Sequence, residues 1–391
     1  FKKPSDSTVA GRRVRMKTRV TLIVLAGLFL LLPVAATAHP ASGIVLDRAG
    51  NVYFSDLETV WKIDPAGKLS VFRAGVSGRH VHELAIDDQD NIYGADVSYE
   101  SAAQKFISDV WKMSLEGGFE YLLEPTDKPP RGMSIWRDRE GNNYLIDQNN
   151  HTKTQTLLLR RSPDGKVITL TGSSYGHADG KGTAARFSSV GNVAFGPDGS
   201  LYLTDGSSVR KVAMDGTVIT LAKGLDSRTR EDKPTLFGGS YGSLAGLTVD
   251  AAGTVYVADA GNRRLFKIDR DGKVDVVLRT DPPYFPNGVV TGPGGNIYVL
   301  EVGFTLPSSW SGARVRKLDA DGKSTILATV GSESGGANLK ASVARNAGAS
   351  AESLLSFFLM GARIKYGVII LSLSILSMVA IVWQRRRRQR G

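Results

Sequence analysis

Five polar residues of this 391-residue chain carry most of the chemistry that it offers: His82, Glu83, His151, Asn287 and Glu301. His82 and Glu83 are adjacent, and an imidazole beside a carboxylate can transfer protons near neutral pH or bind a transition metal. Asn287 would add an amide oxygen. Because the sequence has no cysteine, a thiolate nucleophile, a disulfide framework and a cysteine-held metal are excluded.

These residues are set in a repeating pattern of short apolar segments. Asp-Gly pairs between short apolar runs are typical of β-hairpins. The pattern predicts a four-stranded antiparallel unit, which is too small to bury both of its faces unless it is repeated. It is clearest in residues 191–222, where the runs 192–195, 201–204, 209–213 and 218–221 are separated by turn signals.

The unit occurs six times, and six such repeats predict an all-β fold, a six-bladed β-propeller of four-stranded antiparallel blades. In each unit the second strand ends on an acid, and a base stands five residues before the glycine of the last turn. Because they recur in every blade, these groups favour an ion pair within the blade or a turn-stabilising role over chemistry. The acids are Asp56, Asp96, Asp147, Asp205, Asp259 and Glu301, and the bases are Lys62, Lys112, Arg160, Lys211, Lys267 and Lys317.

Two stretches carry a resemblance to a known family. GLTVDAAGTVYVADAGNRRLFKIDRDGKVDVVL (246–278) and HADGKGTAARF (177–187) resemble NHL repeats of bacterial extracytoplasmic proteins, and the resemblance covers residues 43–331. It implies a propeller. It does not select a function, because NHL-type propellers include protein-binding modules and several unrelated enzymes.

Gluconolactonase-like, regucalcin-like and strictosidine-synthase-like six-bladed propellers are more distant relatives. In the first two, a Glu, two Asn and an Asp at the ends of innermost strands hold an axial divalent cation. Phe-Pro-Asn-Gly at 285–288 resembles one such motif, and His82-Glu83 occupies the place of a second. The other four blades offer Ser42, Arg131, Val190 and Ala245, so the four-oxygen set that a hard cation prefers is incomplete.

His82, Glu83 and Asn287 are therefore candidates for a smaller transition-metal site. His82 and Glu83 are alternatively candidates for proton transfer, since lyase-type propellers use an axial histidine. No cofactor is assigned, and a divalent metal is one hypothesis for this place. Trp61 and Trp111, at the third-strand position that they share with Phe266, are expected in the core between blades.

One face of the predicted disc carries all the long insertions, whereas the turns of the other face are uniformly short. Binding residues concentrate on variable loops that a rigid scaffold holds, so the long-loop face is expected to be the functional one. His151 should lie there, and so should Glu301, the only Glu among the six acids. The insertions are residues 97–109, 148–157, 172–190, 223–244 and 302–313.

The charge of the chain is concentrated at its ends. The net charge is +11, but residues 1–38 carry +6 and residues 354–391 carry +7, which leaves −2 for the rest. A near-neutral body with basic tails is typical of membrane topology and argues against nucleic acid as a partner.

The termini predict export and anchoring. Residues 1–15 read as an upstream or mis-started segment, 16–38 as a signal peptide with a cleavage site after Ala38, and 39–331 as the propeller. Residues 332–365 form a linker and juxtamembrane segment, 366–383 an uncharged stretch long enough for a transmembrane helix, and 384–391 a basic tail. The propeller is thus expected in the periplasm or at the cell surface, with the tail in the cytoplasm.

Two functions fit this sequence. The first is a membrane-anchored, extracytoplasmic NHL-repeat propeller that binds a small ligand or a protein through its long-loop face, with His82, Glu83, His151, Asn287 and Glu301 as its ligand-binding residues. The alternative is a metal-assisted lactonase, hydrolase or lyase at the axial mouth. Whether the chain is an enzyme stays open at this point.

Overall fold

The computed structural model describes residues 43–76, 78–100, 102–129, 134–148, 153–232, 244–305 and 309–331. The predicted signal peptide, linker, transmembrane helix and tail lie outside these residues, as does His151. Within the described ranges, we find no helix with the length and apolar character that crossing a bilayer requires.

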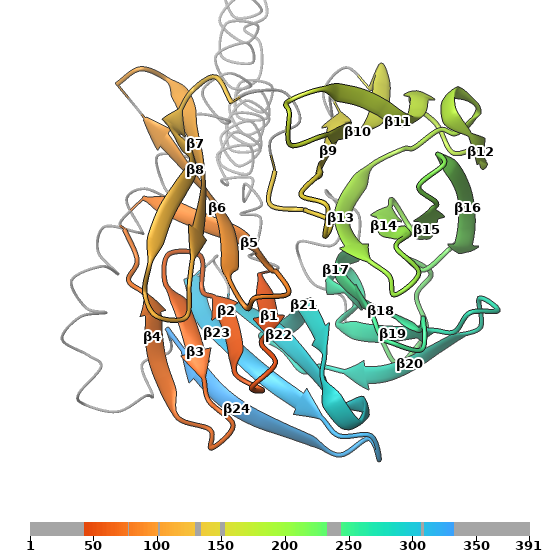
Figure 1. The fold of residues 1–391 in the computed structure, drawn as a ribbon. Coiled ribbons are helices and arrows are strands. Elements are labelled where there is room, and N and C mark those ends of the chain that lie inside the picture. Colours follow the sequence, from red (N-terminus) through yellow and green to blue (C-terminus); the bar gives the residue numbers. More distant parts are fainter. Residues whose placement is uncertain are drawn as a thin grey trace, which may run out of the picture. The chain divides into compact units, whose positions relative to one another are not determined.

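The described strands form six antiparallel sheets, one for each predicted repeat (Figure 1). Blade one contains β1 (Ile44–Leu46), β2 (Val52–Ser55), β3 (Val60–Ile63) and β4 (Leu69–Arg73), and blade two contains β5 (Arg79–Ile86), β6 (Ile92–Glu100), β7 (Lys105–Met113) and β8 (Phe119–Thr126). Blade three contains β9 (Asn143–Gln148), β10 (Gln155–Arg161) and β11 (Val167–Ser174), with an isolated bridge from Arg137 to Asn143.

The second half of the chain repeats the arrangement. Blade four contains β12 (Gly180–Lys181), β13 (Val190–Phe195), β14 (Leu201–Asp205), β15 (Ser208–Val212) and β16 (Thr217–Ala222), and blade five contains β17 (Leu244–Val249), β18 (Val255–Asp259), β19 (Arg264–Ile268) and β20 (Val274–Arg279). Blade six contains β21 (Tyr284–Thr291), β22 (Ile297–Thr305), β23 (Ser309–Leu318) and β24 (Ser324–Val330). Short 3-10 turns are η1 (Gly182–Ala184), η2 (Ala260–Asn262) and η3 (Pro293–Gly295).

The first strands of the blades are the innermost, and packing between blades closes the ring. β1 contacts both β5 and β21, and β17 contacts both β13 and β21 (Figure 1). Six buried apolar clusters each join two neighbouring blades. The cluster between blades one and six includes Phe54 and Trp61 on one side and Leu300 and Val315 on the other. The six-bladed propeller is therefore confirmed, with closure by side-chain packing.

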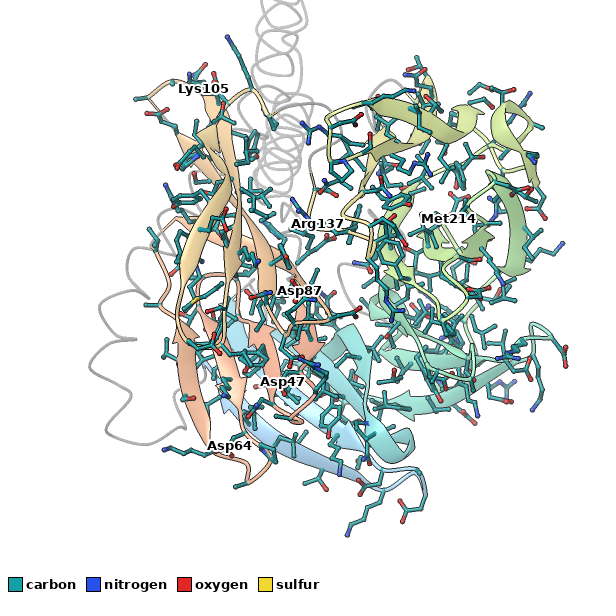
Figure 2. All side chains as sticks on the ribbon, in the orientation of Figure 1. Asp47, Asp64, Asp87, Lys105, Arg137 and Met214 are labelled. Carbon is teal, nitrogen blue, oxygen red and sulfur yellow. The ribbon has the colours of Figure 1, made fainter. Side chains whose placement is uncertain are left out.

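The short turns of the blades are stabilised by a repeated aspartate. Asp47 accepts hydrogen bonds from the backbone and side-chain nitrogens of Asn51 at 2.7 Å each, and from the Tyr53 hydroxyl at 3.1 Å. Asp87 and Asp138 do the same in blades two and three; Asp47 and Asp87 are labelled in Figure 2. Gly50 completes the first of these turns with a φ of 85°, which glycine adopts without a steric penalty.

Contacts between blades also involve cations and sulfur. The Arg137 guanidinium lies 5.4 Å from the centre of the Tyr93 ring, which joins blades two and three. The Tyr144 hydroxyl lies 3.3 Å from the Met214 sulfur and joins blades three and four; Arg137 and Met214 are labelled in Figure 2. Trp61 and Trp111 are buried between blades, as the sequence predicted.

Five of the recurring acids bind third-strand side chains of their own blades, and the predicted bases are not the partners in these contacts; Asp96 also binds Arg73 of blade one. Asp56 and Asp96 each accept a hydrogen bond from a third-strand tryptophan, and Asp205, Asp259 and Glu301 pair with third-strand arginines. The bases instead lie opposite a second-strand tyrosine, as Lys62 lies over Tyr53. The predicted ion pair between the recurring acid and the recurring base of each blade is therefore wrong, because the two side chains are separated along the strands.

Three predicted insertions have structure of their own. Residues 97–109 and the described part of 302–313 continue β6–β7 and β22–β23 as paired strands. Residues 172–190 include β12, which pairs with β16 on the outer edge of blade four, while Phe187 packs between blades three and four. This segment is therefore part of the scaffold and not a free loop.

A buried arginine holds that segment in place. Arg210 is fully buried, and its guanidinium binds Asp205 at 2.7 Å and Asp179 at 2.9 Å. It also donates to the Ala178 carbonyl at 2.8 Å and lies 5.2 Å from the centre of the Phe187 ring. In blade five, the Arg264 guanidinium likewise forms ion pairs with Asp259 and Asp232.

Candidate functional site

The innermost strands carry a β-bulge near the end that leads to the long-loop face. In blade two the register moves from Val81 opposite Asp96 to Glu83 opposite Ala95, so that one residue is extra. In blade six it moves from Pro286 opposite Glu301 to Gly288 opposite Leu300, with Asn287 between them. The strands of blades four and five shift at the same place. Bulges re-aim side chains, and they occur often beside active sites.

The structure places Glu83 in contact with a residue that the sequence analysis missed. The Asn192 side-chain nitrogen lies 3.4 Å from the Glu83 carboxylate. Glu83 belongs to β5 of blade two and Asn192 to β13 of blade four, which are not neighbouring blades. A contact between their innermost strands therefore crosses the interior of the ring.

Register explains why Asn192 takes this place. Val190 lies opposite Asp205 as Val81 lies opposite Asp96, so Asn192 is the counterpart of Glu83. The sequence analysis placed Val190 at the axis in blade four, two positions before Asn192. The signal that could have corrected it is the distance from the terminal acid of the second strand.

Glu83 has an environment suited to proton transfer. Burial raises the pKa of its carboxyl to about 7, and the hydrogen bond from Asn192 only partly opposes that increase. The side chain nevertheless keeps some exposure to solvent. A carboxyl with such a pKa is present in both protonation states at neutral pH, as a general acid or base requires.

His80 and His82 precede Glu83 on β5. Their rings are 6.0 Å apart and edge to face. The His82 carbonyl accepts a hydrogen bond from the Gly43 backbone at 3.2 Å, which ties β5 to blade one. Burial lowers the pKa of His80, so His80 is neutral at pH 7.

Asn287 and Glu301 both belong to blade six. Asn287 is at the bulge of β21, only 2 % exposed. Glu301 is fully buried and forms ion pairs with Arg314 and Arg316 of the neighbouring strand. Arg314 in turn lies 3.9 Å from the centre of the Tyr284 ring. The Glu301 carboxylate is thus paired within its own blade. These contacts do not support its predicted role as a ligand-binding residue.

The residues that the structure describes do not make a complete cation site. Among the residues that the structure describes, no three His, Asp or Glu side chains come together as metal ligands. Glu83 meets the nitrogen of the Asn192 amide, whereas a hard cation requires six or more oxygens around it. We therefore assign no step of the chemistry to a metal.

Asp109 is a second carboxyl with a high pKa, but its surroundings indicate a structural role. Burial and the nearby Asp96 raise its pKa to about 6. Both aspartates are buried, and each has an arginine partner, Arg79 at 3.3 Å for Asp109 and Arg73 at 2.6 Å for Asp96. Such a paired cluster, which joins blade two to the neighbouring blade one, differs from Glu83, which faces another blade across the ring.

An open cavity of about 680 Å³ lies on the long-loop side of blade four. Its volume is in the range of small-molecule sites. The turn between β14 and β15 and the connections before and after the blade form its walls, so this face does carry a concave polar surface. The lining residues are His177, Ser188, Asp205, Ser207, Ser208, Lys223, Gly224 and Ser227.

Replacing Glu83 by Gln is expected to remove a pH dependence of stability. The unfolded pKa of a glutamate is near 4.5 and the folded pKa of Glu83 about 7, so the protonated form stabilises the fold. That stabilisation is complete below about pH 4.5 and is lost as the pH rises through 7, by about 3 kcal/mol. In urea unfolding, Glu83→Gln should therefore gain stability relative to wild type from pH 5 to pH 8.

Glu120, an exposed residue of β8, is the matched control for this measurement. Glu120→Gln should follow the wild-type stability curve at every pH. Asp109 titrates in both proteins, so its contribution cancels in the difference between their free energies of unfolding. A constant difference for Glu83→Gln between pH 5 and pH 8 would show that the carboxyl titrates as in water.

Comparison with known proteins gives matches only among solved structures. No family model and no curated protein matches the chain. A virginiamycin B lyase from Staphylococcus aureus is 16 % identical, with a TM-score of 0.41, over 74 % of this chain and 84 % of the other. A gluconolactonase from Xanthomonas campestris is 14 % identical, with a TM-score of 0.42, over 67 % of this chain and 83 % of the other.

A regucalcin from Agrobacterium tumefaciens is 14 % identical, with a TM-score of 0.39, over 68 % of this chain and 83 % of the other. Gluconolactonase and regucalcin structures thus appear among the similar propellers, while the NHL label stays a prediction. At these identities the function has to be argued from the chain's own residues.

Proposed function

We propose that this chain is an enzyme that uses Glu83 for proton transfer at the axial mouth of the propeller. The observation that carries the proposal is the contact between Glu83 of blade two and Asn192 of blade four, 3.4 Å apart across the ring. A rigid inner strand positions the carboxylate at a bulge, and a second inner strand supplies the group that orients it. It corresponds to the alternative function predicted from the sequence, a lactonase, hydrolase or lyase at the axial mouth, with proton transfer by Glu83 in place of metal assistance.

The reaction class that suits such a group is cleavage of an ester or lactone C–O bond. As a base, Glu83 would take a proton, either from a water that attacks the carbonyl carbon or from the carbon next to the one that bears the ester oxygen, where a C=C bond forms as the carboxylate leaves. As an acid, it would return that proton to the leaving oxygen. The first route is hydrolysis and the second is elimination, and both need one carboxyl with a pKa near neutrality.

The test is turnover of a panel of lactones and cyclic esters by the full chain, followed by elemental analysis of the same sample. Turnover that depends on Glu83, without a stoichiometric divalent metal, supports the proposal. Turnover that disappears on dialysis against chelator and returns with one metal per chain would instead support the metal-assisted reading. If the panel gives no turnover, the binding reading takes precedence.

That second candidate, ligand binding through the long-loop face, is favoured by the cavity on blade four. Serine hydroxyls and the Lys223 ammonium suit an oxygen-rich ligand of small size. Replacing Ser207 by Trp should fill the cavity and abolish binding there, without affecting a reaction at Glu83. Loss of both activities together would mean that the two places form one site.

We also propose that the propeller is exported and anchored in a membrane, with its tail in the cytoplasm. The support is the signal-like segment 16–38 together with the uncharged stretch 366–383 and the arginines after it. Alkaline phosphatase fused after Gly331 should be active in a bacterial host, and the same fusion after Arg390 should be inactive. The reverse pattern would invert the topology, and two inactive fusions would contradict export.

A further inference from the structure

Three polar side chains beside the recurring acids bind the two strands that meet across the ring. They are Ser55, directly before Asp56, Gln148, directly after Asp147, and Thr204, directly before Asp205. The other positions directly before and after the six acids hold only Ala, Val, Ile, Leu or Gly. The three exceptions form hydrogen bonds with β5, which carries Glu83, or with β13, which carries Asn192.

Thr204 binds the backbone of Asn192 itself. The Asn192 N–H donates to the Thr204 hydroxyl oxygen at 3.0 Å, and Thr204 is only 1 % exposed. Gly191 permits this close approach, because a Cβ atom there would lie 2.8 Å from the same oxygen. Asn192 lies in the bulge of β13, where the register with β14 is interrupted. The threonine hydroxyl therefore supplies the acceptor that a regular ladder would provide.

Gln148 holds the start of the same bulge from the neighbouring blade. Its side-chain nitrogen donates to the Val190 carbonyl at 2.7 Å, and its side-chain oxygen accepts from the Val190 N–H at 3.1 Å. One amide side chain thus binds both polar backbone groups of Val190. Because Val190 precedes Asn192 by two residues, blade three fixes the backbone from which the Asn192 side chain extends.

Ser55 acts in the same way on the strand of Glu83. Its hydroxyl donates to the Val81 carbonyl at 2.8 Å and accepts from the Leu57 N–H at 3.0 Å. The Val81 N–H donates in turn to the Leu57 carbonyl, so that blade one binds both polar backbone groups of Val81. Val81 precedes Glu83 by two residues, as Val190 precedes Asn192.

We propose that Ser55, Gln148 and Thr204 are positioning residues that keep the Asn192 side chain against the Glu83 carboxylate. Side chains that served the propeller scaffold in general would recur in every blade, whereas these three bind only the strands of Glu83 and Asn192. Their catalytic meaning rests on the proposed function of Glu83. The geometry itself can be tested without turnover.

The contact between Glu83 and Asn192 depends strongly on the position of the two strands. Its length of 3.4 Å is near the upper limit for a hydrogen bond, so a small outward shift of the backbone would end it. The hydrogen bond from Asn192 lowers the pKa of the Glu83 carboxyl against the larger effect of burial. Losing the contact should therefore raise the pKa of Glu83.

The experiment measures the titration midpoint of Glu83 by difference infrared spectroscopy, between each variant and the same variant carrying Glu83→Gln. Thr204→Val keeps the shape of the side chain but removes the acceptor, and it should raise the midpoint by about half a pH unit. Gln148→Leu and Ser55→Ala should also raise it, from blades three and one. Thr204→Ser restores the hydroxyl and should return the midpoint to the wild-type value.

Thr171→Val is the matched control. Thr171 is also fully buried, and its hydroxyl donates to the Gly182 carbonyl at 3.0 Å, on the outer strand β11. Losing that hydrogen bond should leave the midpoint of Glu83 unchanged. A double-mutant cycle isolates the route of the effect, since Thr204→Val should raise the midpoint no further once Asn192 is replaced by alanine.

The inference is overturned if the folded variants keep the wild-type midpoint, or if Thr171→Val shifts it as much as they do. Should Thr204→Val fail to fold, Gln148→Leu and Ser55→Ala decide the question. Raised midpoints without turnover of any ester or lactone would support the positioning role and contradict the proposed function. Turnover that depends on Glu83, with unchanged midpoints in the variants, would do the reverse.

Discussion

Glu83→Gln is expected to reduce kcat at pH 7 by a factor of 10² to 10⁴ on any ester or lactone that the chain cleaves. Glutamine keeps the shape of the side chain but cannot carry a charge or accept a proton. The Asn192 side chain should remain close to the substituted amide, so that KM should change much less than kcat. Initial rates of wild type and variant over a range of substrate concentrations separate the two effects.

Glu120→Gln, the exposed control on β8, should leave both constants unchanged. Asn192→Ala should retain part of the activity and raise the pKa of the pH–rate profile, because it removes the hydrogen bond that partly opposes the effect of burial on Glu83. If Glu83→Gln keeps the wild-type kcat, Glu83 takes no part in the reaction. The cavity on blade four would then be the better candidate site.

Arg210→Ala is expected to destabilise the propeller by about 3 to 5 kcal/mol. The substitution leaves Asp205 buried without its cation, since the guanidinium lies 2.7 Å from that carboxylate and both side chains are fully buried. It also releases Asp179 and the Ala178 carbonyl, which hold the segment before blade four. Urea unfolding at pH 7 measures the loss.

Lys181→Ala is the control for this second substitution. Lys181 and Asp215 form an exposed ion pair on the same segment, and such pairs contribute at most about 1 kcal/mol. Arg210→Met tests the interpretation further, because it keeps apolar volume and should still be destabilising while Asp205 stays unpaired. Equal stabilities of Arg210→Ala and Lys181→Ala would contradict the conclusion that Arg210 holds the segment before blade four in place.

The fold could be predicted because each blade repeats the same local signals. A last turn that contains glycine, alternating apolar runs and a terminal acid occur in every unit, and a four-stranded unit needs neighbours to bury its faces. The tryptophans illustrate the same logic, since Trp61 and Trp111 occupy equivalent positions and both are buried between blades. Repetition therefore fixes the architecture more firmly than any single segment does.

The candidate site could be predicted only in part, because a bulge changes which residue faces inward. Counting along the sequence gave His82 and Glu83 correctly as residues at the end of an inner strand, but gave Val190 where the register requires Asn192. An extra residue in one strand leaves no mark in an apolar pattern. The contact across the ring joins residues 109 positions apart, which local sequence signals do not reveal.

Partners of charged groups were equally hard to predict. An acid at the end of the second strand and a base on the third recur in every blade, but Asp205 binds Arg210 while Lys211 binds Asp198 near the opposite end of the strand. Alternation along a strand sends adjacent side chains to opposite faces, so neighbouring residues choose different partners.

The pKa of the Glu83 carboxyl in the folded chain tests the central claim most directly. The difference infrared spectrum between wild type and Glu83→Gln isolates the carboxyl and carboxylate bands of this one side chain as the pH is varied from 4 to 9. The structure predicts a midpoint of about 7. A midpoint near 4.5, the ordinary value for a glutamate, would contradict the assignment of Glu83 as the proton-transfer group.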